Sequence, residues 1–155
     1  RTYLSVPQAI MNAGAKVHLE ERDWRGIYQL CPHPIYDAAK RLTSGMYIPN
    51  TYMCLSFHHK KILKIGKGGA ILTDDPRAVE WLKKYRYEGR DHIRDNIDMC
   101  GMNAYMTPEQ AARGLTLLQV LPEHNEDQIE SPPYRDLRTM PLFEESDSTL
   151  EREAK

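Results

Sequence analysis

The feature that most limits the fold of this chain is a glycine-rich turn, Gly66-Lys67-Gly68-Gly69, between two β-rich apolar segments. The segments at 62–65 and 70–73 are predicted to be strands joined by this turn, because glycine adopts the backbone conformations that tight turns need. Asp75 and Pro76 follow, and an acidic residue before a proline marks the start of a helix. Strands that lead directly into a helix indicate an α/β fold.

The other elements are assigned from the same local signals. Thr107, Pro108 and Gln110 form a capping-box pattern, and apolar residues then recur at helical spacing until Pro122. The order strand–helix–strand at the beginning of the chain is the unit from which parallel sheets are built. Helices are predicted at 7–13, 76–88 and 107–121, strands at 2–6, 16–19, 27–30, 35–39, 52–57, 62–65 and 70–73, and an exposed loop at 90–98.

Composition limits the partners of the protein. The 155 residues include 21 Lys and Arg against 22 Asp and Glu, so a net charge of −1 gives no case for binding nucleic acid. No apolar run is long enough to cross a membrane. Cys31, Cys54 and Cys100 are too scattered for a disulfide framework or a zinc site. We therefore expect a cytoplasmic protein that binds neither nucleic acid, membrane nor metal.

A change in composition near residue 122 predicts two parts. Residues 1–122 are expected to form the α/β domain. Residues 123–155 are rich in Asp and Glu and poor in aliphatic residues, which is typical of an extension that does not build its own core. We expect this acidic extension to be ordered to about Phe143 and loose after it.

The densest group of reactive side chains is Ser56-Phe57-His58-His59-Lys60-Lys61, shortly before the glycine turn. A phosphate loop of the triphosphatase type is excluded, because Gly68 stands where that motif needs Ser or Thr. A basic nucleic-acid patch is disfavoured, since the lysines alternate and no aromatic ladder accompanies them. The third interpretation is a lysine that forms a Schiff base, with Ser56 holding a phosphate nearby.

A carboxylate upstream makes the third interpretation chemically complete. Pyridoxal phosphate needs a lysine that carries it, and an acidic residue that keeps its ring nitrogen protonated. Asp37 directly follows a β-rich pair and precedes small residues. An Asp and a Lys at such a separation occur in many chains, however, so the pair alone also allows Asp37 to be a turn residue and Lys61 a solvated one.

Several motifs in order resemble the DegT/StrS-type aminotransferases, which use pyridoxal phosphate to aminate keto-sugar nucleotides. The resemblance covers residues 2 to 121. Its segments are Thr2-Tyr3 with Ala13-Gly14-Ala15-Lys16, Tyr36-Asp37-Ala38-Ala39, Ser56 to Lys61, Gly66 to Asp75, Tyr85-Arg86 with Gly89, and Gly101 to Leu118. It implies a reduced version of the large domain of the aspartate-aminotransferase class, with a mixed, mostly parallel sheet and flanking helices.

The resemblance also implies roles for single residues. Lys61 would carry the cofactor and act as general acid and base, and Asp37 would face the pyridine nitrogen. Ser56 would bind the cofactor phosphate, and Tyr3 would stack on the ring. Asn103 would reach the phosphate in a neighbouring subunit, so a homodimer with a shared active site is expected, acting on a nucleotide sugar and an amino-acid donor.

The chain departs from the family pattern in ways that leave a second function open. It looks truncated, because it has no counterpart of the family's N-terminal phosphate turn and a shortened stretch before Asp37. Lys40 stands near the cofactor where the family has Gln or His, and Ala104-Tyr105 replaces Tyr-Arg. The alternative to an aminotransferase is a non-catalytic scaffold of the same fold that binds a partner or an anion.

Overall fold

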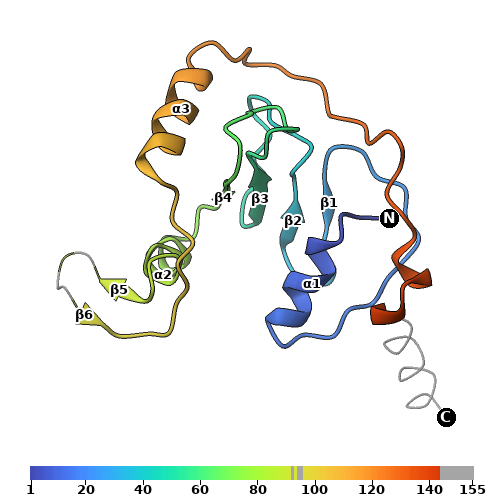
Figure 1. Cartoon of the computed structure of the whole chain (residues 1–155), viewed down its shortest axis with the longest axis horizontal. Helices are drawn as coiled ribbons and strands as arrows, with labels where there is room; N and C mark the ends of the chain where they lie inside the picture. The colour runs from blue at the N-terminus through green and yellow to red at the C-terminus, as the bar shows by residue number, and fades with distance from the viewer. Residues whose placement is uncertain (92, 94–95, 144–155) are drawn as a thin grey trace. The chain divides into compact units, whose positions relative to one another are not determined.

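The computed structural model describes residues 1–91, 93 and 96–143 (Figure 1). The chain divides into two compact units. The first unit combines Arg1–Trp24 with the chain after Ile129, and the second is Arg25–Ile129. These units are defined by the contacts within each of them. The predicted division at residue 122 rests on a change in composition, so it stays a prediction. None of the helices in the described part of the chain is long and apolar enough to cross a membrane.

The second unit is built on a four-stranded sheet with the order β1-β2-β3-β4 among the described residues (Figure 1). The strands are β1 (Tyr28–Gln29), β2 (Ile35–Asp37), β3 (Tyr52–Ser56) and β4 (Gly69–Leu72). The sheet is mixed, as predicted, but only β2 and β3 are parallel, so the expectation of a mostly parallel sheet is wrong. The connector between β1 and β2 is too short for a parallel crossover, which forces these strands to be antiparallel.

The first unit does not contain the strands predicted at 2–6 and 16–19. Helix α1 (Ser5–Asn12) begins inside the first of these segments and carries Pro7 in its first turn, where a proline amide is not needed. Residues 15–24 are irregular. The predicted strand–helix–strand opening is therefore wrong. The helix begins at Ser5, before Pro7, and so includes residues that the sequence pattern assigned to a strand.

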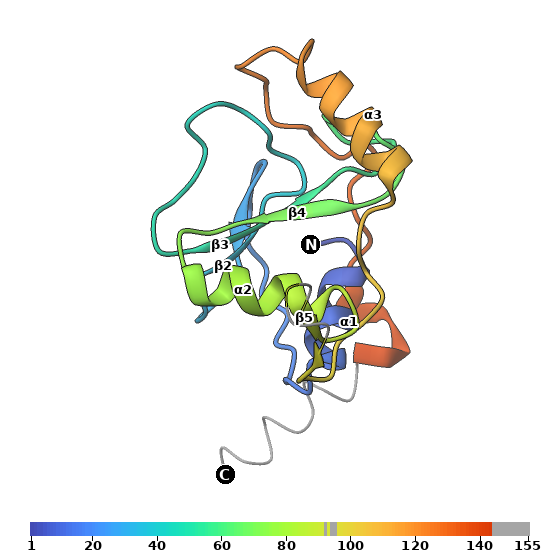
Figure 2. The same cartoon turned by 90° about the vertical axis from the view of Figure 1, so that its left-hand side faces the viewer.

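The segment at 62–65 is the other predicted strand that does not form. Leu63 and Ile65 are 3% and 5% exposed, so their apolar character reflects burial in the second unit. β4 pairs with β3 instead (Figure 2). In this pairing Gly69 lies opposite Ser56. The glycine turn thus returns the chain to β3 from an irregular loop that spans residues 57–68.

Two helices of the second unit follow their predicted caps. The Asp75 carboxylate accepts hydrogen bonds from the first amides of α2 (Pro76–Tyr85), and Thr107 and Gln110 form the predicted capping box of α3 (Pro108–Leu118). Helix α2 ends before the predicted residue 88, because Glu88 and Gly89 have positive φ values of 61° and 79°. These residues belong to the left-handed region, which terminates helices.

The segment predicted as an exposed loop at 90–98 forms a short antiparallel pair, β5 (Arg90–Asp91) with β6 (Asn96–Ile97). Beyond it, the extension after Pro122 contains the 3₁₀ turn η1 (Leu137–Thr139) and is described as far as Phe143, which is 2% exposed. The loose end expected after Phe143 lies outside the described residues.

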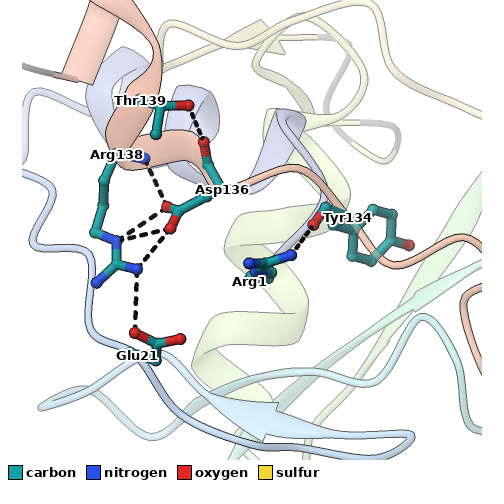
Figure 3. A network of polar contacts seen from close by, with 6 residues as sticks. All are labelled: Arg1, Glu21, Tyr134, Asp136, Arg138 and Thr139. Carbon is teal, nitrogen blue, oxygen red and sulfur yellow. Dashed lines mark hydrogen bonds and ion pairs between the residues drawn. The ribbon is translucent and has the colours of Figure 1, made fainter.

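A polar network joins the two ends of the chain within the first unit (Figure 3). The Arg138 guanidinium donates to both carboxylate oxygens of Asp136, at 2.9 Å from Nε to Oδ1, and to Glu21 Oε2 at 3.1 Å. Arg1 Nη1 donates to the carbonyl oxygen of Tyr134 at 3.5 Å. The hydrogen bond from Arg138 is the main reason that the pKa of Asp136 is lowered to about 2.

The low pKa of Asp136 predicts an acid-sensitive first unit. An unfolded Asp titrates near pH 3.9, so the stabilisation from the ionised carboxylate is complete above that pH and is lost as the pH falls toward about 2. Asp136→Asn should therefore flatten the dependence of stability on pH between about 4 and 2. Urea unfolding followed by Trp24 fluorescence, in a Trp81→Phe background, measures it. Glu20→Gln, which removes a carboxylate from an exposed pair with Arg22, is the control. Equal pH slopes for the two variants would contradict the prediction.

Two glycines of the second unit give a matched test of its packing. A Cβ at Gly69 would lie 2.3 Å from the carbonyl oxygen of Leu55, closer than any real contact, whereas a Cβ at Gly114 would meet Ile65 at an ordinary 3.5 Å. Gly69→Ala should destabilise the protein by about 1–3 kcal/mol, because the backbone must move. Gly114→Ala should be neutral or stabilise by up to about 1 kcal/mol through helix propensity. Chemical denaturation measures both, and a larger loss for Gly114→Ala would contradict this packing.

Candidate functional site

The parallel pair β2–β3 gathers three candidate side chains on one face of the sheet. Asp37 on β2 lies opposite Cys54 on β3, so their side chains share a face. Ser56 is two residues beyond Cys54 on the same strand, and successive side chains alternate, so it shares that face as well. Met53, on the opposite face, is fully buried. The structure thus brings Asp37 and Ser56, two of the predicted site residues, to one face of the sheet.

Two protein donors orient the Asp37 carboxylate. Tyr28 lies directly opposite Asp37 in the antiparallel register of β1 and β2, and its hydroxyl donates to Asp37 Oδ2 at 2.9 Å. The amide of Ala39 donates to Oδ1 at 2.9 Å. A carboxylate has about four acceptor positions. One hydrogen bond on each oxygen therefore fixes the side chain and leaves capacity for a further donor.

Cys54 is the neighbour that sequence reasoning did not place in the site. Its thiol is largely buried, and burial, with a smaller contribution from the nearby Asp37 charge, raises the pKa of Cys54. A raised pKa keeps most of the thiol protonated near neutral pH, so Cys54 reacts more slowly than an ordinary cysteine. Only the strand register reveals Cys54 and Tyr28, since no local motif marks either residue.

Lys61 lies in the loop that leaves β3 directly after Ser56. Its side chain is half-buried, and its amide donates to the carbonyl oxygen of His58 at 2.8 Å. Lys60 and Lys64, the flanking alternatives, are exposed. The rings of His58 and His59 lie with their centroids 3.9 Å apart and their planes tilted by 41°. The pKa of His58 is lowered, mainly by desolvation and then by the charges of His59, Lys60 and Lys61.

The lysine loop, residues 57–68, is held at its base and on one side. At the base, the amides of Phe57 and His59 donate to the carbonyl oxygens of Gly68 and Gly66, at 2.9 and 3.1 Å. On the side, Arg113 Nε of α3 donates to the carbonyl oxygen of Lys64 at 3.3 Å. These bonds fix the backbone around Lys61.

Lys40 lies at the end of β2, three residues beyond Asp37, and is 7% exposed. Its carbonyl oxygen accepts a hydrogen bond from the amide of Gln128 at 2.9 Å. A lysine rarely reaches this degree of burial unless its charge is compensated. Its burial distinguishes it from the solvated lysines of the loop.

Two other predicted residues are not part of β2, β3 or the lysine loop. Asn103 is exposed, and its Nδ2 donates to Glu88 Oε1 at 3.2 Å next to the bridge between Tyr87 and Asn103. Tyr3 belongs to the first unit, where it is 59% exposed and its ring centroid lies 5.9 Å from that of Tyr134. Their predicted roles toward a cofactor stay predictions.

A shallow depression at the other end of β3 is lined by Asn50, Tyr52, Thr73, Asp74 and Asp75. Its polar groups are already engaged, since Tyr52 Oη donates to Asp75 Oδ2 at 2.8 Å and the Asn50 amide donates to Asp74. The hydrogen bond to Asp75 is the main reason that the pKa of Tyr52 is raised. These contacts cap α2 and close the end of the sheet, so the depression is structural.

Comparison with protein families matches residues 31–137 to the DegT/DnrJ/EryC1/StrS aminotransferase family. The chain belongs to this family. The match spans more than half of the chain and includes the β2–β3 face and the lysine loop. The predicted resemblance is therefore confirmed, and the family assignment supports aminotransferase-type chemistry at the level of the family.

Among curated proteins, the chain is similar to Protein Rv3402c and Protein MT3510 of Mycobacterium tuberculosis and to Protein Mb3436c of Mycobacterium bovis. Each is 40% identical over 63 residues, which is 41% of this chain. The aligned part covers only 15% of each of these relatives. A search of solved structures found no match.

Proposed function

We propose that this chain is the cofactor-binding part of a pyridoxal-phosphate-dependent aminotransferase. The observation that carries the proposal is the β2–β3 register, which puts Asp37 and Ser56 on one face and leads directly into the loop of Lys61. The residue types fit the group: a carboxylate for the pyridine nitrogen, a hydroxyl for the phosphate, and a lysine for the aldehyde. When bound, pyridoxal phosphate supplies the electron sink of the reaction.

In this proposal Asp37 binds and orients the pyridine ring. Tyr28 and Ala39 each donate a hydrogen bond to one of its two oxygens. The carboxylate can therefore accept a further hydrogen bond from the protonated ring nitrogen while it keeps its orientation. Preorganised charge of this kind costs no reorganisation when the ligand arrives. A carboxylate beside the ring nitrogen favours the protonated ring.

Lys61 is proposed as the point of covalent attachment and as the group that moves the substrate proton. It is half-buried, whereas Lys60 and Lys64 are exposed, and the backbone on both sides of it is hydrogen-bonded. A lysine held in this way reacts at a defined position, which general acid–base catalysis requires. Ser56, at the base of the same loop, is proposed to bind the cofactor phosphate through its hydroxyl.

The finer parts of the proposal concern substrates and partners. The family resemblance supports transfer of an amino group from an amino acid to a keto-sugar nucleotide. It also supports a homodimer in which Asn103 reaches the neighbouring site, and Asn103 is exposed as that role needs. Tyr3 and Lys40 are proposed to contact the ring and its phenolic oxygen.

A non-catalytic scaffold is the second candidate function. The observation that favours it is Lys40, a buried lysine where the family has Gln or His. A second cation next to the cofactor would alter the charge around the phenolic oxygen. Under this alternative the same face binds an anion, and the lysine loop supplies positive charge without turnover.

Replacement of Lys61 tests the proposed function directly. The wild-type protein mixed with pyridoxal phosphate should develop a visible absorption band, and borohydride reduction followed by peptide mapping should place the cofactor on Lys61. Lys61→Ala should abolish both signals, because the flanking Lys60 and Lys64 are exposed, whereas Lys61 is half-buried. Lys60→Ala is the matched control, since it removes a neighbouring exposed lysine, and it should retain both signals. Adduct spread over several lysines in the wild type, or a band that survives in Lys61→Ala, would contradict the proposal.

A further inference from the structure

A short segment after α3, residues 123–128, forms hydrogen bonds both to the chain that follows β2 and to the lysine loop. It follows Pro122 and stays within the second unit. The carbonyl oxygen of Glu123 accepts a hydrogen bond from the amide of Ser44 at 2.7 Å, next to the residues that leave β2. We call residues 123–128 the crossing segment. Their acidic composition predicted that these residues belong to an extension. In the structure they are hydrogen-bonded to the chain that follows β2.

Gln128 makes the contact that matters for the site. Its amide donates to the carbonyl oxygen of Lys40 at 2.9 Å, and its side-chain Nε2 donates to the carbonyl oxygen of Lys60 at 3.1 Å. One residue therefore bridges the chain after Asp37 and the loop that carries Lys61. The bridge to the loop comes from the side chain, so a substitution can remove it while the backbone bond to Lys40 remains.

The crossing segment is itself firmly anchored before Gln128. Asp127 forms a two-point ion pair with Arg41, at 2.8 Å from Nε to Oδ1 and 2.6 Å from Nη2 to Oδ2. The hydrogen bond from Arg41 is the main reason that the pKa of Asp127 is lowered. Asn125 Nδ2 donates to the carbonyl oxygen of Leu42 at 3.0 Å. Paired guanidinium and carboxylate groups of this geometry fix orientation as well as position.

The Gln128 side chain is poorly explained by stability alone. Its Nε2 is hydrogen-bonded, but its Oε1 is buried and has no hydrogen-bond partner. A buried acceptor without a partner opposes folding, so an apolar side chain of the same length would be as stable or more stable there. A glutamine at such a position is understandable if its donor has a task in placing the loop.

We infer that Gln128 is a positioning residue, which fixes the loop of Lys61 relative to the strand end that carries Asp37. This inference rests on the proposed function. Gln128 acts through the backbone of Lys60, next to the reactive lysine, and is not assigned any contact with the cofactor. Arg113 restrains the loop at Lys64, on the other side of Lys61. The two restraints together bracket the lysine.

The test is the substitution Gln128→Met in the full chain. Methionine keeps the length of the side chain and removes both the donor and the unpartnered acceptor, so the fold should be retained. Amide hydrogen exchange should become about fivefold faster in residues 58–65, as expected for the loss of one net hydrogen bond. With pyridoxal phosphate and borohydride, the adduct should spread from Lys61 to Lys60 and Lys64, and the visible circular dichroism of the bound cofactor should weaken.

Gln119→Met is the matched control, because Gln119 is an exposed C-cap residue of α3. It should leave the exchange rates, the adduct position and the circular dichroism unchanged. If Gln128→Met behaves in the same way as this control, the inference is overturned. If the wild type itself shows no adduct on Lys61, the proposed function fails, and unchanged exchange in residues 58–65 would then overturn the bridge independently.

Discussion

The parallel pairing of β2 with β3 is the interaction on which the candidate site depends. It sets Asp37 opposite Cys54 and brings Ser56 to the same face, although the two strands are separated by a long irregular connection. A shift of one residue in this register would move Ser56 to the opposite face, because side chains alternate along a strand. Gly69 supports the pairing from the other edge, since only a residue without a Cβ allows β4 to lie against Leu55. The small size of the sheet makes each of these contacts important.

The lysine loop depends on restraints from outside the sheet. Its base is bonded to the glycine turn, α3 holds it through Arg113, and the crossing segment holds it through Gln128. These restraints come from three separate parts of the sequence but act on one short loop. A reactive lysine needs a fixed position relative to its partner carboxylate, because small displacements remove the benefit of a preorganised site. The second unit is therefore best understood as a frame for one strand pair and one loop.

The sequence predicted those features that local chemistry determines. The caps at Asp75 and Thr107 placed both helix starts, and the apolar segment at 52–57 gave β3. The sequence-based prediction failed where pairing between distant segments determines the structure. An example is the segment at 62–65, whose apolar residues are buried but lie in a loop. The family motifs predicted Asp37, Ser56 and Lys61 as site residues. The positions of Tyr28, Cys54 and Gln128 next to them become visible only when the strand register and the path of residues 123–128 are known.

Protection of Cys54 by pyridoxal phosphate is the most direct measurement of the central claim that this face of β2–β3 binds the cofactor. Cys54 shares the face with Asp37, whereas Cys31 and Cys100 are exposed and serve as internal controls in the same sample. Thiol modification followed by mass spectrometry, with and without the cofactor, gives the rate at each cysteine. The account predicts slower modification of Cys54 alone when pyridoxal phosphate is present. Equal rates at Cys54 in both conditions would contradict it.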